Sequence, residues 1–553
     1  MMPLPRYTAS VISKTLIQCA VLLLLFFASC QRSTDEGKQV FRYNEDGPLT
    51  SLDPAFARTQ GNTWIVNQLF NGLVQLDANM QVQPCIAQRW TIDETHTVYT
   101  FYLRNDVHFH TDDYCHGRKV TAQDFLYSFR RILNKSLASP GAWVFAAVQK
   151  DSAGEPTGFE VPNDSVFIIR LKKPFSPFLP LLTQSYCCVL PHESVEHWGK
   201  EFRSHPVGTG PFCFYLWDEG VRLILHKNTN YFETDSTGYT LPYLDAVSVS
   251  FMDNKLAAFL SFTKGELDFF NGLESSYKDE VLQKNGMLKP SYEKRFVLQS
   301  VPYLNTEYIG FLVDDTSTFA RSEAVSNKAF RKAINFAINR DELVTYLRNN
   351  IGTPGTSGFT PEGFPLLDAK HITGYFYSPD SAAYYMKLSG LQGKTIELPL
   401  YTTQQYLDIA VLLQNQLSKI GVRIKIEVNQ SSFNRALINK GKALFFRASW
   451  IADYPDPENF LGLFYSRNYC PNGPNYTHFN NAEYDALYEK SVAETSDSVK
   501  YACFGAMEQI LLREAPVVTL FYDKTFRLLQ KNISGLQANA LNIPVLKYVR
   551  KEK

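Results

Sequence analysis

The chain has no excess of charge of either sign, because its 55 lysines and arginines balance its 55 aspartates and glutamates. A neutral protein gives no electrostatic reason to expect a nucleic acid or another highly charged partner. The sequence also lacks internal repeats and low-complexity segments. Its 553 residues, 45% of them apolar, exceed what one hydrophobic core usually supports. We therefore expect a globular protein of two or more domains.

Motifs of common active sites are missing as well. No serine has glycine at both flanking second positions, which excludes the G-x-S-x-G nucleophile elbow. His192 and His197 in "HESVEH" are five residues apart, about 140° around a helix, so they cannot easily share one metal ion. "GTGP" (208–211) lacks the third glycine of a dinucleotide fingerprint and the Gly-Lys-Ser/Thr ending of a phosphate loop. It predicts a tight turn.

One stretch, "HFHTDDYCHG" (108–117), is richer in side chains that can bind metals. It holds His108, His110, Cys115 and His116, but their spacing matches no established zinc pattern. We expect a solvated hairpin loop here, and we expect neither a metal nor a cofactor anywhere in the protein.

The amino terminus predicts export. Arg6 and Lys14 precede the apolar run "AVLLLLFFAS", which is too short for a relaxed membrane span but suits a secretory signal over residues 1–29. The run ends in "FFASC", and this ending resembles the lipobox of bacterial lipoproteins, in which the cysteine, here Cys30, is acylated. The alternative is an ordinary signal with a chance cysteine. No other apolar segment approaches about 18–20 residues, so we expect a lipid-anchored protein with a polar tether over residues 30–40.

Cysteines do not specify a disulfide framework. Of nine, Cys19 lies within the signal and Cys30 at its end. Seven cysteines are left, and an odd number cannot all pair within the chain. Export permits disulfides, but the spacing of these cysteines indicates no particular pairing. The seven are Cys85, Cys115, Cys187, Cys188, Cys213, Cys470 and Cys503.

Strand-like and helix-like segments alternate along the chain, which predicts a mixed α/β architecture. "TVYTFYLRNDVHF" (97–109) has the apolar alternation of a strand. In the helix-like "TAQDFLYSFRRIL" (121–133), Thr121 can cap the helix, and Phe125, Phe129 and Leu133 share one face. The stretch "YLDIAVLLQNQLSKIG" (406–421) ends in glycine and leads into the strand "VRIKIEV" (422–428), a helix-to-strand unit typical of α/β folds. Further helices are expected over 327–347 and 480–494, and turn-rich breaks fall at 204–211, 300–306 and 352–365, of which the first two are candidate domain boundaries.

The stretch "LFFRASWIADYPDP" (444–457) begins as a strand that Pro455 and Pro457 stop. Arg447 lies within this strand and Asp453 follows it. A surface ion pair or a solvated loop would explain both residues. The alternative is that a donor and an acceptor of opposite sign, at the end of a buried strand, bracket a zwitterion such as a free peptide.

The chain resembles the solute-binding proteins of ABC importers that carry oligopeptides and dipeptides, which form family 5 of the extracellular solute-binding proteins. The resemblance runs from about Phe41 to the carboxyl end, and its markers occur in family order. They are "SLDP" (51–54), "VTAQDFLYSFRRIL" (120–133), "PVGTGPF" (206–212), "NTNYF" (228–232), "LPYLDAV" (241–247), "KGELDFF" (264–270), "AFRKAINFAINRDELV" (329–344) and "SWIADYPDPENFL" (449–461).

The resemblance implies an α/β, two-lobe periplasmic-binding-protein fold of type II, cluster C, with an extra subdomain and a hinged ligand cleft. In this chain, lobe I would comprise 41–60, 206–303 and 523–553, the extra subdomain 61–205, and lobe II 304–522. The protein would be a monomer without enzymatic activity. It would face the periplasm or the cell exterior and deliver peptides to the permease and ATPase subunits of an importer.

The resemblance also implies a site. Asp453 would hold the α-amino group of a peptide, and Arg447 can meet the carboxylate of some peptide lengths. The peptide would lie as an added strand between backbone near Ser449, Trp450 and Ile451 on one side and Leu49 and Thr50 on the other. Such main-chain recognition tolerates varied side chains.

Two alternatives stay open from the sequence. Within the family, the ligand could be a nickel chelate, haem or another small solute that bears an amine. A secreted hydrolase is the alternative from another class, and Asp453 with Asp456 or Glu458 is its only visible carboxylate pair.

Overall fold

The computed structural model describes residues 37–272, 274–314, 324–364 and 372–552. The predicted signal, Cys30 and most of the predicted tether lie outside these residues. Within them, no helix is both long and apolar enough to cross a membrane.

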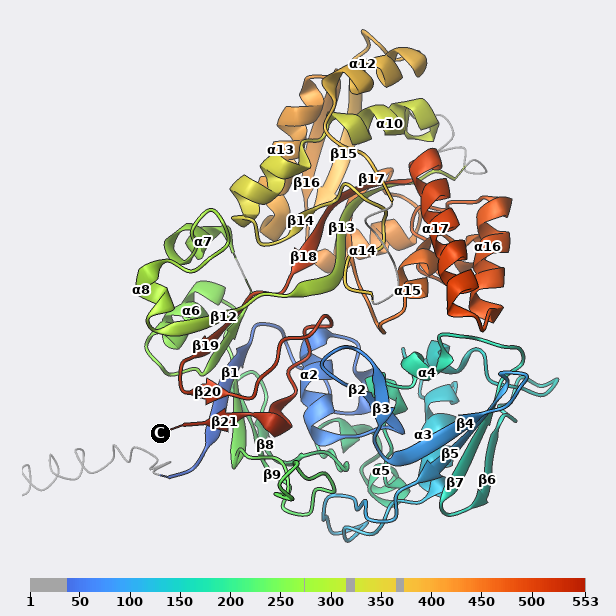
Figure 1. Cartoon of the computed structure of the whole chain (residues 1–553), viewed down its shortest axis with the longest axis vertical. Coiled ribbons are helices and arrows are strands. Elements are labelled where there is room, and N and C mark those ends of the chain that lie inside the picture. Colours follow the sequence, from blue (N-terminus) through green and yellow to red (C-terminus); the bar gives the residue numbers. More distant parts are fainter. Residues whose placement is uncertain (1–36, 273, 315–323, 365–371, 553) are drawn as a thin grey trace, which may run out of the picture.

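The three largest sheets of the described chain organise the molecule (Figure 1). A seven-stranded sheet combines parallel and antiparallel pairs in the order β12 (Phe296–Gln299), β19 (Arg527–Gln530), β11 (Phe269–Asn271), β1 (Val40–Glu45), β10 (Ala246–Phe251), β9 (Arg222–Lys227) and β8 (Phe212–Asp218). A six-stranded sheet has the order β14 (Thr353–Pro354), β18 (Val517–Lys524), β13 (Pro302–Phe311), β17 (Phe445–Ile451), β15 (Ile396–Thr402) and β16 (Val422–Val428). A four-stranded sheet has the order β4 (Ala87–Ile92), β5 (Val98–Leu103), β7 (Val166–Arg170) and β6 (Phe159–Asn163).

These sheets form two bodies. The upper body contains the six-stranded sheet and the described residues between β13 and β18, and the lower body contains the rest (Figure 1). The chain passes between them twice, once at 300–301 and once at 525–526. The two crossing segments bond to each other, because the Thr525 N–H donates to the Val301 carbonyl at 2.9 Å and the Val301 N–H to Thr525 Oγ1 at 3.0 Å.

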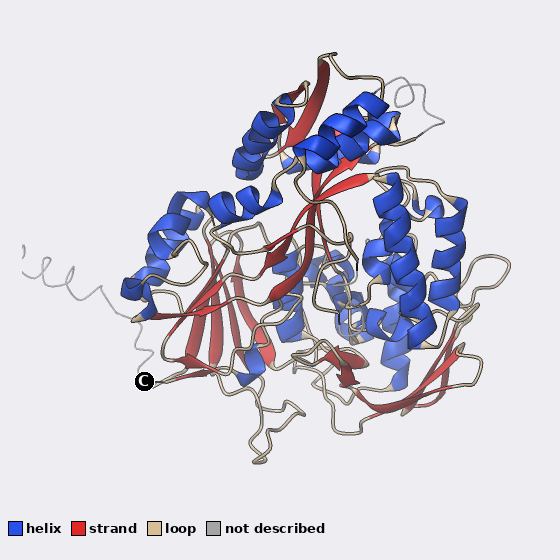
Figure 2. Ribbon diagram, turned by 45° about the horizontal axis from the view of Figure 1, so that its top comes forward, coloured by secondary structure: helices blue, strands red, loops and turns tan. Residues whose placement is uncertain are grey.

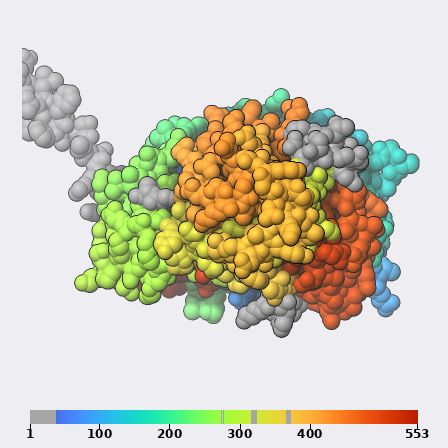
Figure 3. Space-filling view, turned by 90° about the horizontal axis from the view of Figure 1, so that it is seen from above, coloured from blue at the N-terminus to red at the C-terminus, as the bar shows by residue number. Residues whose placement is uncertain are grey.

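Helices flank the strands of the upper body (Figure 2). In the view from above, the yellow and orange part of the upper body covers the middle of the molecule (Figure 3). Contacts with the sheet come from α10, α13 and α14. The helices of this body are α10 (Lys328–Ala337), α11 (Arg340–Glu342), α12 (Pro379–Leu388), α13 (Leu407–Ser418), α14 (Ser431–Asn439), α15 (Glu458–Leu461), α16 (Ala482–Ala493) and α17 (Asp497–Glu514).

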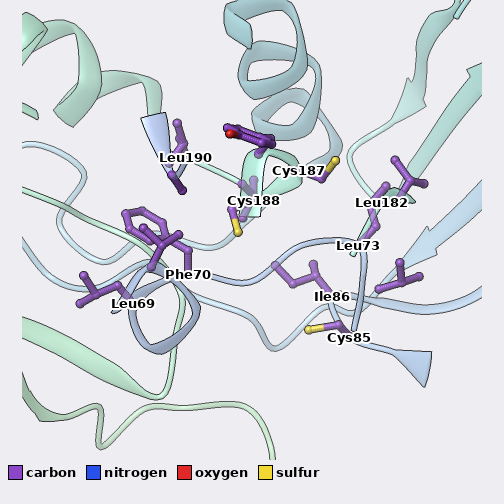
Figure 4. Close-up of a cluster of buried hydrophobic side chains, with 14 of the residues drawn as sticks. Leu69, Phe70, Leu73, Cys85, Ile86, Leu182, Cys187, Cys188 and Leu190 are labelled. Carbon is purple, nitrogen blue, oxygen red and sulfur yellow. The ribbon is translucent and has the colours of Figure 1, made fainter. Parts of the chain in front are cut away.

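The lower body holds α2 (Gln60–Leu69), α3 (Ala122–Leu133), α4 (Phe178–Leu181), α5 (His192–Trp198), α6 (Lys255–Thr263), α7 (Ser275–Val281) and α8 (Pro290–Glu293). Its core gathers side chains from segments far apart in sequence. Around the end of α2, Leu69 and Phe70 lie near Cys188 and Leu190, while Cys85 and Ile86 approach from the segment just before β4 (Figure 4). All seven cysteines of the described chain are free thiols, and six are buried, so burial and not cross-linking accounts for them.

Several predicted elements are confirmed. Thr121 precedes α3, and its N–H donates to Asp124 Oδ2 at 2.8 Å in a capping box. Phe125 and Phe129 are fully buried on that helix. The predicted helix-to-strand unit over 406–428 is also present. Gly421, at the turn between its two parts, has φ +80°, and the strand that follows, β16, pairs in parallel with β15.

Other expectations were wrong in detail. The strand predicted over 97–109 ends at Leu103. The single helix predicted over 327–347 breaks at Ile338, where Asn339 begins a new turn by accepting the Glu342 N–H. "GTGP" (208–211) forms no tight turn. It lies so close to the end of α2 that a Cβ at Gly208 would meet the Leu69 carbonyl at 2.1 Å, which explains the need for glycine.

The loop that carries His110 and Cys115 is not fully solvated, contrary to expectation. Both side chains are buried. His110 Nε2 lies 3.0 Å from the Gly210 carbonyl, and the Cys115 thiol donates to the His110 carbonyl at 3.4 Å. Burial lowers the pKa of His110 to about 4, so the ring is neutral at pH 7 and tethers the loop to the 208–211 segment. No cluster of potential metal ligands occurs among the described residues.

Candidate functional site

The predicted contact strand, β17, has one partly unpaired edge. On one side it pairs antiparallel with β13 along its whole length, from Phe445 with Phe311 to Ile451 with Asn305. On the other side, its pairing with β15 within the described chain is confined to Phe446 with Tyr401. The backbone after Phe446 is therefore available to an added strand.

The predicted contact residues Ser449, Trp450 and Ile451 all lie along this edge. Ser449 and Trp450 are half-buried, and Ile451 is exposed although it is apolar. The Trp450 indole donates to Asn459 Oδ1 at 3.0 Å. This bond fixes the end of β17 to α15.

Asp453 follows the strand, and two backbone hydrogen bonds position it. Its N–H donates to the same Asn459 oxygen at 3.0 Å. Its carbonyl accepts a hydrogen bond from the Gln184 side chain of the lower body. Asp453 is an exposed residue, yet desolvation by the surrounding protein raises the pKa of its carboxyl to about 6, with a smaller opposing effect of the Asn459 hydrogen bond. The carboxyl can therefore be reached by a ligand, although it loses part of the hydration that favours its ionised form.

The carboxylates that follow Asp453 have structural partners. Asp456 lies 3.4 Å from Lys500 Nζ. Glu458 accepts hydrogen bonds from the hydroxyls of Tyr454 and Tyr488. All of these side chains are buried. The carboxylates that a hydrolase would need beside Asp453 thus hold the Pro-rich loop in place.

Arg447 does not face the cleft as a free cation. Its guanidinium forms an ion pair with Glu307 of β13, and the exposed fractions of the two side chains are only 13% and 4%. The guanidinium carbon also lies 3.2 Å from the centre of the Tyr406 ring. The buried Nε has no hydrogen-bond partner within the described chain. Glu307 therefore neutralises most of the positive charge of Arg447, which was expected to meet the carboxylate of a ligand.

Leu49 and Thr50 lie in an extended segment of the lower body, after β1. Leu49 is half-buried against the lower core, and Thr50 is exposed. The segment is held where the Leu52 N–H donates to the Arg203 carbonyl at 2.8 Å. No hydrogen bond in the described chain joins either residue to Asp453.

The contacts between the bodies near Asp453 come from residues that the sequence did not indicate. Besides Gln184, the Trp143 ring lies 6.4 Å from the Tyr454 ring, and the Ser176 N–H donates to the Val492 carbonyl at 2.8 Å. These residues carry no motif. They come close to Asp453 only because segments that are distant in sequence pack against each other.

A separate cavity of about 910 Å3 lies in the lower body. Its walls come from the end of α2, from the hairpin of β2 (Val74–Leu76) and β3 (Val82–Pro84), and from the segment 534–550. Gln184 lines it too, so the cavity adjoins the segment that carries Asp453. None of the predicted ligand-binding residues lines it.

Comparisons with known proteins agree with this arrangement. The model of the bacterial extracellular solute-binding proteins, family 5, matches residues 81–469. The chain is 25% identical over 525 residues to the periplasmic murein peptide-binding protein MppA of Escherichia coli, with 91% of each chain covered. It is 24% identical to the dipeptide-binding protein DppE of Bacillus subtilis, over 95% of this chain and 94% of that protein.

Solved structures show the same fold. The periplasmic binding protein DppA of Helicobacter pylori, in complex with the peptide STSA, superposes with a TM-score of 0.77 at 24% identity, over 94% of this chain and all of that one. The unliganded open form of the murein tripeptide-binding protein MppA gives a TM-score of 0.72 at 22% identity, over 93% and 98% of the two chains. The predicted two-lobe fold is confirmed.

Proposed function

Because the chain belongs to family 5 of the bacterial extracellular solute-binding proteins, we propose that it captures short peptides between its two bodies and delivers them to an ABC importer. The observation that carries this proposal is Asp453, a carboxyl with a raised pKa at the end of a strand whose edge is partly open; no lysine or arginine of the described residues pairs with it. A peptide supplies both missing parts, an amine for the carboxyl and a backbone for the edge.

The proposal extends to the organisation of the protein. Lobe I comprises 41–60, 206–303 and 523–553, the extra subdomain 61–205, and lobe II 304–522. Hinge closure at the paired segments around Val301 and Thr525 encloses the ligand. The mature protein is a lipoprotein anchored through Cys30, a monomer in the cell envelope without enzymatic activity. Permease and ATPase subunits on other chains drive transport.

Native mass spectrometry of the soluble form that lacks residues 1–30 tests this proposal. The form is purified without added ligand, since an enclosed ligand copurifies with the protein. We expect a ladder of added masses that fit short peptides, lost in Asp453→Ala. In the matched control Asp113→Ala, which removes an exposed aspartate of the extra subdomain, the ladder is retained. A single mass of a nickel chelate or of haem, kept in Asp453→Ala, would contradict the proposal.

A further inference from the structure

A thiol, an imidazole and a carboxylate form a hydrogen-bonded row in the upper body, outside the residues of the candidate site. Cys470 Sγ lies 3.1 Å from His478 Nε2, and the other ring nitrogen, Nδ1, lies 2.8 Å from Asp314 Oδ2. Among the cysteines of the described chain, Cys470 alone has an imidazole nitrogen within hydrogen-bond distance. A nucleophile, a base and a group that orients the base, in this order, are the arrangement by which proteins activate a thiol.

The loop between the short turn η10 (Ser466–Asn468) and α16 brings the thiol and the imidazole together. The carbonyl of the fully buried Asn475 accepts the N–H groups of Cys470 and of His478, each at 3.4 Å. The backbone of His478 has φ +53°, in the left-handed region that residues other than glycine rarely adopt. The Tyr469 ring stacks on the imidazole, with centres 4.7 Å apart and planes within 6° of each other. The backbone and the Tyr469 ring therefore hold the imidazole in one orientation.

Asp314 determines which nitrogen of this ring carries the proton. It follows β13, and the preceding Val313 N–H donates to the Thr477 carbonyl at 2.8 Å, which brings the carboxylate beside the ring. An ionised carboxylate only accepts hydrogen bonds, so the neutral ring carries its proton on Nδ1. Nε2 is then an acceptor and faces the Cys470 thiol. This is the tautomer in which an imidazole can act as a general base.

The Cys470 thiol is protonated at rest and is reached only through a small opening. Burial raises its pKa, and the backbone N–H groups of Cys470 and Gly441 oppose this rise. A reaction of the sulfur therefore needs a base that takes the proton as the new bond forms, and His478 Nε2 lies at the right place. The exposed fraction of Cys470 is 6%. Such an opening favours a reactant of nearly the size of water over a bulky electrophile.

We propose that Cys470 is a reactive thiol that hydrogen peroxide oxidises to a sulfenic acid, with His478 as the general base. The sulfur attacks one peroxide oxygen, so that an S–O bond forms as the O–O bond breaks. The sulfur is oxidised by two electrons, which the peroxide receives. The thiol proton passes through His478 Nε2 to the leaving oxygen, which departs as water. One thiol and one hydrogen peroxide thus give one sulfenic acid and one water, and this chemistry does not depend on the ligand of the protein.

Timed oxidation of the full-length chain in mild detergent by hydrogen peroxide tests the proposal. After catalase has removed the peroxide, the protein is unfolded in dimedone, which labels sulfenic acids, and then in N-ethylmaleimide, which labels the remaining thiols. Mass spectrometry of the cysteine peptides gives the oxidation rate of each sulfur, with sulfinic and sulfonic products counted as oxidised. Cys503 of α17 is the internal reference, because its exposed fraction of 4% matches that of Cys470.

We expect Cys470 to be oxidised at least about tenfold faster than Cys503 in the parent protein, because a positioned general base contributes about 10²–10⁴-fold. In His478→Asn the two rates should become similar. Asparagine tolerates the left-handed backbone at this position and can still donate to Asp314, but it cannot take a proton. His108→Asn, which changes an exposed histidine of the lower body, is the matched control and should keep the rate of the parent protein.

Equal oxidation rates of Cys470 and Cys503 in the parent protein would overturn the proposal, and this comparison needs no variant. An unchanged rate of Cys470 in His478→Asn would overturn it too, since the imidazole would then play no part. Circular dichroism shows whether His478→Asn is folded. If it is not, the comparison of the two thiols in the parent protein decides.

Discussion

Arg447 and Glu307 form an ion pair across the neighbouring strands β17 and β13, with the guanidinium lying over the Tyr406 ring. Glu307 is almost wholly buried, and burial raises the pKa of its carboxyl while Arg447 lowers it. The pair therefore holds two charges inside the upper body that must be kept together.

Removal of Arg447 alone should destabilise the protein. Arg447→Ala leaves Glu307 as a buried carboxyl without its cation, and breaking such a pair costs about 3–5 kcal/mol. The double variant Arg447→Gln with Glu307→Gln should recover most of this loss. Urea unfolding followed by circular dichroism measures both. Equal losses in the single and double variants would show that the pair is not coupled.

Asp453 should give the ligand-free protein a characteristic pH dependence. Its pKa of about 6 in the folded state exceeds the ordinary 3.8, so the folded state holds the proton more tightly than the unfolded state does. The stability from this proton is present below about pH 4 and is lost as the pH rises through 6. Asp453→Asn should therefore melt at a higher temperature than the parent protein at pH 8, and at the same temperature at pH 3.5. An equal effect at both pH values would refute the shifted pKa.

Peptide binding should weaken in acid for the same reason. An ammonium group binds the ionised form of Asp453, and a growing fraction of the ligand-free protein is protonated as the pH falls below about 6. The dissociation constant for Ala-Ala-Ala should rise by about tenfold for each pH unit between 5 and 4. Calorimetry at several pH values measures this slope, and a flat profile in that range would assign the amine to another group.

The open edge of β17 should bind peptide backbone. N-methylation of a peptide nitrogen removes a hydrogen-bond donor from the ligand without changing its charge. In a series of tripeptides that are each N-methylated at a different position, at least one should bind about tenfold more weakly than its parent, which corresponds to the loss of one or two net hydrogen bonds. A fluorescence competition assay compares the series. If every N-methylated peptide bound as tightly as its parent, recognition would not use an added strand.

Cys30 should carry the lipid anchor. Cys30→Ala should abolish incorporation of labelled palmitate and shift the protein from the detergent phase to the aqueous phase on phase separation. Cys19→Ala, which changes a cysteine within the predicted signal, is the control and should leave both readouts unchanged. A cytosolic precursor that keeps residues 1–29 would point to failed export, and a processed but unlipidated parent protein would contradict the lipobox.

Local sequence signals predicted the caps and helix ends, because these features depend only on residues that are close together in the chain. The capping box at Thr121 and the unit around Gly421 follow from short-range rules, and the structure contains both. The asparagine that splits the predicted helix at 338–339 is also a local cap signal that sequence reasoning could have used.

Properties that depend on register could not be predicted. Glu307 precedes Arg447 by 140 residues, and they meet only because β13 and β17 pair with Glu307 opposite Ser449. Gln184 reaches Asp453 from the other body. The family resemblance identified Asp453, but it could not show that the arginine six residues earlier already has a partner.

The affinity difference between Ala-Ala-Ala and its N-acetyl derivative, measured by calorimetry in the parent protein and in Asp453→Ala, tests the account most directly. We expect acetylation to cost about 2–5 kcal/mol in the parent protein, the range for truncation of one partner in a buried charge pair, and to cost almost nothing in Asp453→Ala, which binds both peptides weakly. Equal binding of both peptides by the parent protein would contradict Asp453 as the amine anchor.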